Sequence, residues 1–164
     1  MTTYIRKDEI NIREKLHQLE SKQDKPPYIP AFSCAGGGTY NASTGDQNIA
    51  AYCAGSSNSG VLFDIGSNLT NGAFKVPFAG LYKFSLKLQV NYSSGYLFSY
   101  IYKNSSAIAN HSCQFYQSNN VCTLDLIWPA DTNDIFEPYI TNNYAISNAL
   151  SSPVWNGYYI GPTT

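Results

Sequence analysis

The side chains of this sequence that could do chemistry are few, and the densest group of them is acidic. Asp131, Asp134 and Glu137 fall within seven residues of one another. Carboxylate oxygens are the ligands that Ca²⁺ prefers, which makes this segment a candidate calcium site. Counting from Asp131, however, Ile135 and Phe136 occupy the fifth and sixth loop positions, where an EF-hand needs an oxygen ligand and a glycine. We therefore predict a solvated turn between strands, with calcium binding as the alternative.

Nucleophilic and acid–base catalysis find little support in the residue pattern. The two histidines are His17 and His111, and the chain has no HExxH or paired CxxC pattern that would assemble a zinc site. The segment GSSNS at 55–59 lacks the final glycine of a nucleophile elbow. The glycines at 36–38 precede no expected helix, so they do not form a phosphate cradle. We predict no enzyme, no catalytic residue and no cofactor.

The four cysteines, Cys34, Cys53, Cys113 and Cys122, allow two interpretations. An even number suits two disulfides in an oxidising compartment, with Cys113 and Cys122 facing each other across a hairpin and the other two paired. Residues 1–9 are polar and charged, unlike a secretory signal peptide. On that ground we expect synthesis in a reducing cytosol, where the cysteines are small buried hydrophobes. Free thiols are the favoured prediction and two disulfides the alternative.

Several tyrosines near polar segments are candidate ligand-binding residues. The amphipathic ring of tyrosine can stack on a sugar ring, and binding residues usually lie on loops at the surface. The candidates are Tyr92, Tyr96, Tyr116 and Tyr144. The competing interpretation, packing within strands or in a subunit interface, is favoured for each of them.

Composition limits the classes of partner. The chain has 164 residues, a formal net charge of −1 and 43% hydrophobic residues, which suits one domain with an ordinary core. Nucleic-acid and anionic-membrane binding need a clustered excess of Lys and Arg, which is missing, so we expect neither partner. No stretch approaches the ~18 apolar residues of a membrane span.

The chain divides into two parts that differ in their content of charged residues. Of 10 Lys and Arg and 11 Asp and Glu, six and five respectively lie within residues 1–25. Ile5, Ile12, Leu16 and Leu19 lie there at the heptad spacing of a short coiled-coil seam, and three prolines within 26–30 end the pattern. We predict a trimeric helical stalk or anchor over 1–25, a Pro-rich linker over 26–31 and a head over 32–164. The alternative is an amphipathic helix docked on its own domain.

The head has the pattern of an all-β domain. Residues 82–90 alternate apolar and polar side chains over nine positions, the clearest such run in the chain. Residues 122–128 repeat the alternation, and further strands are expected at 61–65, 73–78, 96–103, 134–140 and 154–160. Short strands at this spacing predict a β-sandwich or jelly roll.

One stretch of the head carries a more specific pattern. It reads VLFD at 61–64, then Asn68 and NG at 71–72, and then F-x-x-P-x-x-G-x-Y-x-F-S over 74–85. A closing segment, PVWNGYYI, follows at 153–160. The pattern resembles the signature of the complement C1q-like globular domain. The matching positions are Phe63, Asp64, Asn68, Gly72, Phe74, Pro77, Gly80, Tyr82, Phe84, Trp155 and Gly157.

The resemblance covers roughly residues 32–162, with Asn133 and Trp155 standing where the family usually has Gly and Phe. Residues 36–60 have no clear counterpart. The resemblance implies a ten-stranded jelly roll that assembles as a homotrimer, similar to tumour necrosis factor, with a stalk before the head. A heptad helix of this length is only marginally stable alone in water. It therefore fits a stalk that forms when trimerisation of the heads brings three such helices together. Members of the family act as recognition modules.

From these features we predict a non-enzymatic virion structural protein, a head or tail fibre or a capsid decoration at the virion surface. Its partners are expected to be two further copies of itself, a capsid or tail protein bound through residues 1–25, and a host-surface glycan or protein bound through the head. A charged start without a signal and a surface rich in Ser, Asn, Thr and Tyr fit this prediction. The alternatives are a secreted, extracellular C1q-type innate-immune or lectin-like protein and a trimeric cytokine-like ligand.

Overall fold

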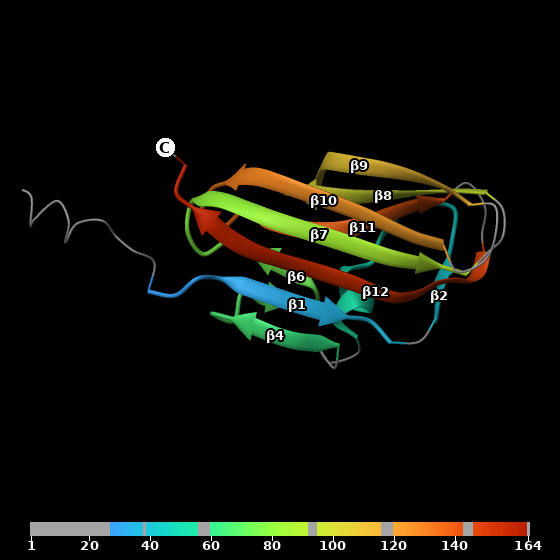
Figure 1. The fold of residues 1–164 in the computed structure, drawn as a ribbon, viewed down its shortest axis with the longest axis horizontal. Coiled ribbons are helices and arrows are strands. Elements are labelled where there is room, and N and C mark those ends of the chain that lie inside the picture. The colour runs from blue at the N-terminus through green and yellow to red at the C-terminus, as the bar shows by residue number, and fades with distance from the viewer. Residues whose placement is uncertain are drawn as a thin grey trace, which may run out of the picture.

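The structure is a computed structural model, and it describes residues 27–37, 39–55, 60–91, 95–115, 120–142 and 146–163. Within these ranges the chain forms twelve strands and one short helix (Figure 1). Their order is β1 Ala31–Ala35, β2 Thr39–Ala42, β3 Gly45–Asn48, α2 Ala50–Ala54, β4 Val61–Ile65, β5 Leu69–Thr70, β6 Ala73–Lys75, β7 Gly80–Val90, β8 Gly95–Lys103, β9 Ser106–Phe115, β10 Asn120–Ala130, β11 Ile135–Asn142 and β12 Ile146–Gly161.

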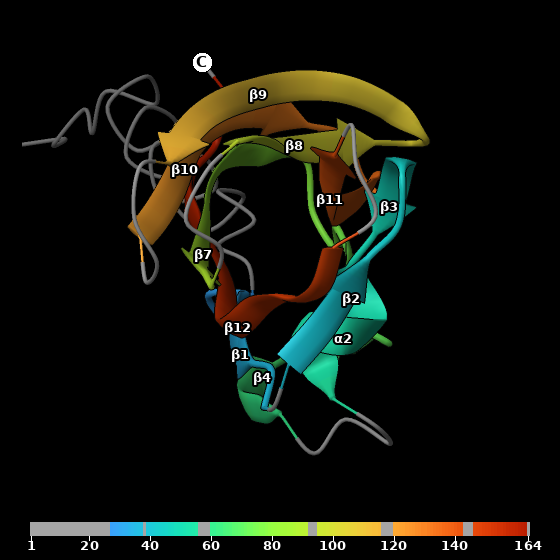
Figure 2. The same ribbon diagram turned by 90° about the vertical axis from the view of Figure 1, so that its right-hand side faces the viewer.

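Two antiparallel sheets enclose the core as the layers of a sandwich (Figure 2). The first sheet has the order β10-β7-β12-β1-β4, with β2 beside β12. The second sheet has the order β5-β6-β11-β8-β9, with β3 beside β11. The predicted jelly-roll sandwich is confirmed. Ten strands were expected, and the short β2, β3 and α2 arise from residues 36–60, the segment without a counterpart in the family pattern.

The alternating run at 82–90 forms most of β7, as predicted. Its even-numbered side chains point into the core because successive residues of a strand face opposite sides of the sheet. β7 pairs with β10 over its full length, from Val90 opposite Asn120 to Gly80 opposite Ala130, so the predicted strand at 122–128 is the middle of β10. The core-facing residues of β7, all fully buried, are Tyr82, Phe84, Leu86, Leu88 and Val90.

Aromatic rings fill the space between the sheets. Phe84 stacks on Phe136, with ring centroids 4.3 Å apart, and on Trp155 at 5.5 Å. Phe32 stacks on Phe74 at 4.7 Å. All five side chains are almost completely buried. Because these rings come from both sheets, the signature positions Phe74, Phe84 and Trp155 hold the sandwich together.

Two signature glycines are required by close approaches. A Cβ atom on Gly157 would lie 2.5 Å from the ring of Phe32 and 2.8 Å from that of Phe84. Gly72 has a φ angle of +79°, which favours glycine, and its carbonyl accepts a 3.0 Å hydrogen bond from the indole of Trp155. Packing around the core therefore accounts for both positions.

Polar signature positions shape the turns beside the core. The carboxylate of Asp64 accepts hydrogen bonds from the backbone N–H groups of Asn68 and Leu69, both at 2.9 Å. The hydroxyl of Tyr82 donates to the carbonyl of Phe78 at 2.8 Å, so the buried phenol is satisfied. These residues serve the fold of the head, which explains why their spacing marks a fold family.

The second half of the predicted linker lies against the head. The ring of Tyr28 contacts that of Phe78, with centroids 5.4 Å apart. The carbonyl of Pro30 accepts a 2.9 Å hydrogen bond from the backbone N–H of Tyr159 on β12. The chain therefore enters the head beside β12, and residues 28–30 pack on the head.

The predicted stalk lies outside the described residues, and so does the domain boundary at residue 25. The seam positions concerned are Ile5, Ile12, Leu16 and Leu19, and the coiled coil stays a prediction. In the part of the chain that the structure describes, no helix has the length and apolar character needed to cross a membrane.

Candidate functional site

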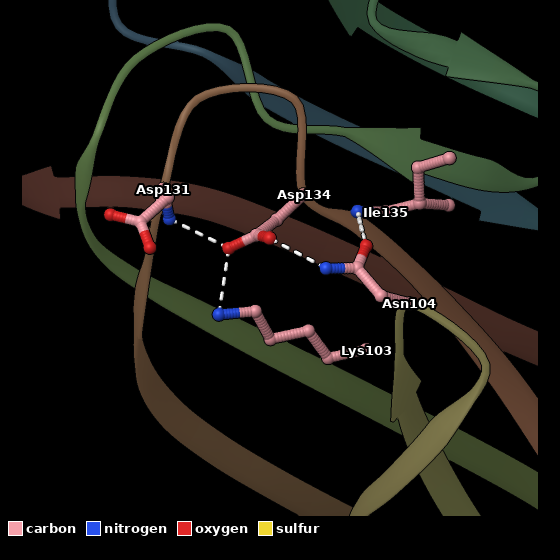
Figure 3. Close-up of polar contacts among 5 residues, drawn as sticks. All are labelled: Lys103, Asn104, Asp131, Asp134 and Ile135. Atoms are coloured by element: carbon pink, nitrogen blue, oxygen red, sulfur yellow. Dashed lines mark hydrogen bonds and ion pairs between the residues drawn. The ribbon is translucent and has the colours of Figure 1, made fainter.

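Asp134 closes the turn between β10 and β11 (Figure 3). Its carboxylate accepts three contacts of 2.7 Å: an ion pair from Lys103 Nζ and hydrogen bonds from Asn104 Nδ2 and the backbone N–H of Asp131. Asn104 Oδ1 accepts the backbone N–H of Ile135 at 2.9 Å. These contacts join the β8–β9 turn to the β10–β11 turn at one end of the sandwich.

The environment of Asp134 stabilises its charged form. Burial alone would raise the pKa of this carboxyl group, but the hydrogen bonds from Lys103, the Asp131 amide and Asn104 together lower it below its ordinary value. The predicted solvated turn is therefore wrong in one respect, because Asp134 is buried and paired. Sequence reasoning missed Lys103 because the lysine comes from a different strand.

The structure does not gather Asp131, Asp134 and Glu137 around one point. Glu137 lies on β11 and accepts a 2.7 Å hydrogen bond from Asn48 Nδ2, whereas the oxygens of Asp134 face Lys103 and the turn. In the described ranges, no group of three His, Cys, Asp or Glu side chains is placed to hold a metal ion. The calcium alternative thus has no supporting geometry in this part of the chain.

Cys34 and Cys53 are buried free thiols, in agreement with the favoured prediction. Burial raises the pKa of Cys34 to about 12, although its thiol also donates a 3.4 Å hydrogen bond to the carbonyl of Trp155. Burial, and next the neighbouring Cys34, raise the pKa of Cys53 well above its ordinary value. Since the thiolate is the reactive form, both groups are inert at neutral pH.

Cys122 departs from the prediction of free thiols, because it is disulfide-bonded. It is buried on β10, with its sulfur 3.6 Å from the hydroxyl oxygen of Ser99. The side chain of Cys113, its partner in the hairpin hypothesis, lies outside the described side chains. Free thiols were predicted from the polar first residues of the chain. Whether two cysteines form a disulfide depends instead on which strands lie next to each other.

The histidines do not assemble a catalytic group in the described residues. His111 is exposed on β9, and its backbone carbonyl accepts a 3.3 Å hydrogen bond from Ser99. His17 and residues 56–59 lie outside the described ranges. The absence of enzymatic activity remains a prediction for the whole chain.

The outward surface of the first sheet carries exposed apolar side chains, here called the apolar face: Phe63, Ile65, Ile127 and Tyr158. The backbone register runs Ile65–Ala31–Tyr158–Lys83–Ile127 across five strands. The exposed fractions of the four side chains range from 46% to 58%. Lys83 lies between Tyr158 and Ile127 in this register, so the apolar side chains stand on both sides of one charged residue. Exposed apolar side chains gathered on one side of a sheet are typical of a surface that another molecule covers.

The outward surface of the second sheet carries four rings, here called the aromatic face: Phe98, Tyr100, Tyr102 and Tyr139. Along β8, ring centroids lie 6.5 Å apart for Phe98 and Tyr100 and 6.2 Å apart for Tyr100 and Tyr102. Tyr102 stacks on Tyr139 of β11 at 4.0 Å. The alternate residues of β8 face the core, so its aromatic side chains share the outer side of the sheet.

Of the four tyrosines predicted to bind a ligand, the structure describes Tyr96, which is 50% exposed on β8. Tyr92, Tyr116 and Tyr144 lie outside the described residues, so their role stays a prediction. The aromatic face was not among the candidates, although residues 96–102 read YLFSYIY. An aromatic residue at every second position of a strand was the signal that could have found it.

The fold defines the class of this protein as a jelly roll of the C1q and tumour necrosis factor type. The globular domain of zebrafish complement 1qA is similar over 83% of this chain and 100% of its own, with a TM-score of 0.59 and 18% sequence identity. Murine APRIL is similar over 81% of this chain and 100% of its own, with a TM-score of 0.59 and 9% identity.

A viral structure shares the same fold. The PRD1 vertex protein P5 is similar over 80% of this chain and 97% of its own, with a TM-score of 0.58 and 16% identity. No family model and no curated protein matches the sequence. At these identities the likenesses establish the architecture alone, and they confirm the C1q-type fold that the signature residues indicated.

Proposed function

We propose that this protein is a non-enzymatic, homotrimeric virion structural protein, a fibre or capsid decoration. Residues 1–25 anchor it to a capsid or tail protein, and the head is displayed at the virion surface for attachment to a host ligand. The observation that carries the proposal is the apolar face on a jelly roll whose fold recurs in the PRD1 vertex protein P5.

The apolar face supports the self-association part of the proposal. Each of its side chains remains about half exposed, and covering the exposed part contributes on the order of 1 kcal/mol per side chain. The same face is present on every copy of the chain, so a rotational assembly can cover it in all copies at once. A trimer closed in this way buries the aliphatic and aromatic surface of three heads.

The direction of the chain supports a head anchored at one end. Residues 28–30 lie against the end of the sandwich where β1 begins and β12 ends, whereas β7 and β11 end on the opposite side (Figure 1). An anchor formed by residues 1–25 therefore leaves the far ends of β7 and β11 directed away from the particle. Recognition modules commonly bind through surfaces exposed in this way.

Light scattering of the full chain tests the assembly. The unaltered protein is expected to have three times the 18.1 kDa mass of one chain. Ile127→Asp with Tyr158→Asp removes two apolar side chains and places two carboxylates on either side of Lys83. The variant is expected to give the single-chain mass, because the interface loses apolar surface and one Lys cannot neutralise both buried carboxylates. The matched control, Ser112→Asp with Gln114→Asp on the second sheet, is expected to stay trimeric. A single-chain mass for the unaltered protein contradicts the proposal.

Mass spectrometry of purified particles tests the virion role separately. The protein is expected among the structural proteins of particles produced by its source. If particles lack it while the isolated chain is trimeric, the virion assignment is wrong and the trimer stands.

One observation favours a second candidate, a secreted C1q-type innate-immune or lectin-like recognition protein. Cys122 is disulfide-bonded, and disulfides persist mainly in oxidising compartments. Recovery of the native protein with its disulfide intact from extracellular fluid, and not from particles, would favour this candidate over the virion protein.

A further inference from the structure

The aromatic face occupies the middle of a continuous outward surface. In sheet order, β3, β11, β8 and β9 follow one another along one wall of the sandwich (Figure 2). The register places Asn48, Tyr139, Tyr100 and Asn110 side by side across these four strands. The rings therefore lie in the centre of the surface, with polar side chains from β3 and β9 on either side.

Hydrogen bonds from one flank hold Tyr102 in place. Its hydroxyl donates to Asp46 Oδ2 at 3.1 Å, and the hydroxyl of Thr141 donates to Asp46 Oδ1. Burial, and next the hydrogen bond to Asp46, raise the pKa of Tyr102. The phenol therefore remains a protonated donor throughout the neutral range.

A second set of contacts holds Tyr139. Asn48 Nδ2 donates to Glu137 Oε1 at 2.7 Å and lies 3.3 Å from the hydroxyl of Tyr139, to which it also donates. The ring of Tyr139 in turn stacks on Tyr102. Side chains that are already ordered lose little entropy when they bind a ligand, so this surface is preorganised.

The opposite flank offers polar groups of another kind. Asn110 and Ser112 lie opposite Tyr100 and Phe98 in the register of β9 and β8, and both are exposed. Gln114 follows at the next outward position and is also exposed. Amide and hydroxyl side chains both donate and accept hydrogen bonds, as the hydroxyl groups of a sugar do.

The charge of this surface discriminates between ligands. At the described outward positions of β3, β8, β9 and β11, the charged side chains are Asp46 and Glu137. Lys103 belongs to the other side of β8 and is paired with Asp134. A surface with two carboxylates and no cation at its described outward positions repels phosphorylated, sulfated and carboxylated ligands and accepts uncharged ones.

We propose that the aromatic face binds a neutral glycan chain. This inference rests on the proposed attachment function and names the class of its ligand. The rings can cover the C–H faces of sugar units, while Asn110, Ser112 and Asp46 exchange hydrogen bonds with the sugar hydroxyls. A second copy of this chain suits the surface less well, because a dry interface would desolvate the carboxylates of Asp46 and Glu137.

Titration of the full chain with defined oligosaccharides tests the proposal. The neutral probes are oligosaccharides of mannose, of glucose and of N-acetylglucosamine, and the anionic probe is an oligogalacturonate of similar length. Ligand-observed NMR and tyrosine fluorescence report binding. At least one neutral probe is expected to bind, and the anionic probe is not.

Substitutions locate the binding on the surface. Tyr100→Ala with Tyr139→Ala is expected to weaken binding of the neutral probe at least tenfold. Asp125→Asn, which alters an exposed carboxylate on the outer side of the first sheet, is the control and is expected to bind as the unaltered protein does. If the double alanine variant does not fold, Asn110→Ala with Gln114→Ala replaces it, with the same direction of change expected.

The possible results separate this inference from the proposed function. Failure of every neutral probe to bind, binding of the anionic probe alone, or unchanged binding by the folded variants overturns the glycan surface. Loss of the trimer in the double alanine variant also overturns it, since the face would then be an interface between copies. Light scattering of the same samples reports the proposed function independently: a trimer that binds no neutral probe refutes only the ligand assignment.

Discussion

The two outer faces of the sandwich differ in chemistry although they cover the same core. The apolar face exposes Ile65 and Ile127 together with the ring of Tyr158, and two of these three side chains have no polar group. On the aromatic face, the hydroxyl of Tyr102 binds Asp46 and that of Tyr139 accepts a hydrogen bond from Asn48. Burying the apolar face away from water is favourable, because it removes apolar side chains from solvent. On the aromatic face, these tyrosine hydroxyls already form hydrogen bonds within the sheet.

The difference shows how one strand pattern serves two purposes. In β7 and β8 alike, every second residue is committed to the core, and the other residues are free to vary. In the first sheet, β7 carries Lys83, Ser85 and Lys87 at such positions, whereas β4, β10 and β12 carry the apolar side chains that suit a permanent interface. The second sheet uses its outward positions for rings and small polar groups that suit reversible contact with a hydroxylated ligand. Four substitutions test whether the two faces are as separate as this comparison states.

The largest effect is expected from Phe84→Ala. The ring stacks on Phe136 and Trp155 between the two sheets, and its removal leaves a cavity that costs about 3–5 kcal/mol of unfolding free energy. Both faces belong to sheets that pack on this core, so trimer formation and glycan binding should be lost at the same urea concentration. A urea titration that follows unfolding, mass and binding measures this. Thr123→Ala, at an exposed position of β10, is the control and should change stability by less than ~0.5 kcal/mol.

The next effect is expected from Asp134→Asn, which removes the charged acceptor at the junction of the two sheets. We expect a loss of about 1.5–3 kcal/mol at neutral pH. Because the pKa of Asp134 is lower in the folded than in the unfolded chain, its contribution is present above the unfolded-state pKa and is lost as pH falls through the folded-state pKa.

The pH dependence distinguishes this role from simple packing. The variant should lose less stability on acidification than the unaltered protein, as thermal unfolding at a series of pH values would show. Asp125→Asn is the control, since that side chain is exposed on β10. Parallel acid curves for Asp134→Asn and the unaltered protein would contradict the expected role of the carboxylate.

A smaller effect is expected from Asn133→Ala in the same turn. Asn133 has a φ angle of +75°, and its backbone N–H donates to the carbonyl of Val76 at 2.8 Å. A Cβ-bearing residue without the local hydrogen-bonding ability of asparagine costs about 1–2 kcal/mol in this conformation. Asn133→Gly, the residue usual in the family pattern, should be close to neutral, and equal losses for the two variants would argue against a conformational cause.

The smallest effect is expected from Tyr102→Phe, which keeps the ring and removes the hydroxyl that binds Asp46. Glycan binding should weaken about threefold, equivalent to ~0.6 kcal/mol, because the ring is held less firmly. The mass by light scattering should not change, since the apolar face is on the other sheet. A change in mass would show that the two faces are not independent.

Strands with a strong alternating pattern could be predicted, and strands without one could not. β7 and β10 followed from alternation alone, because their core-facing side chains are large and apolar. β9 was missed, since Ser106–Phe115 reads SAIANHSCQF and lies at the edge of its sheet, where only one neighbour constrains it. Its start is set by a turn in which Asn104 and Ser105 both have positive φ angles, of 49° and 67°.

Candidate sites were harder to predict, because proximity along the chain is a poor guide to proximity across strands. Asp134 and Glu137 are three residues apart, yet one pairs with Lys103 at the end of the sandwich and the other with Asn48 on the outer surface. Conversely, Tyr102 and Tyr139 are far apart in sequence and stack at 4.0 Å. Tyr96 was predicted from its exposed, polar surroundings, but the stacked rings require knowledge of which strands are neighbours.

By itself, the sequence determined the all-β class and indicated the C1q-type fold. Both depend on local rules. Side chains alternate along a strand, Gly72 has a positive φ angle that favours glycine, and Gly157 leaves no room for a Cβ atom. Only the tertiary structure decided that Lys103 pairs with Asp134, that Cys122 is disulfide-bonded, and that apolar and aromatic side chains gather on opposite sheets. Those outcomes depend on strand order and register, which bring together residues that no local pattern connects.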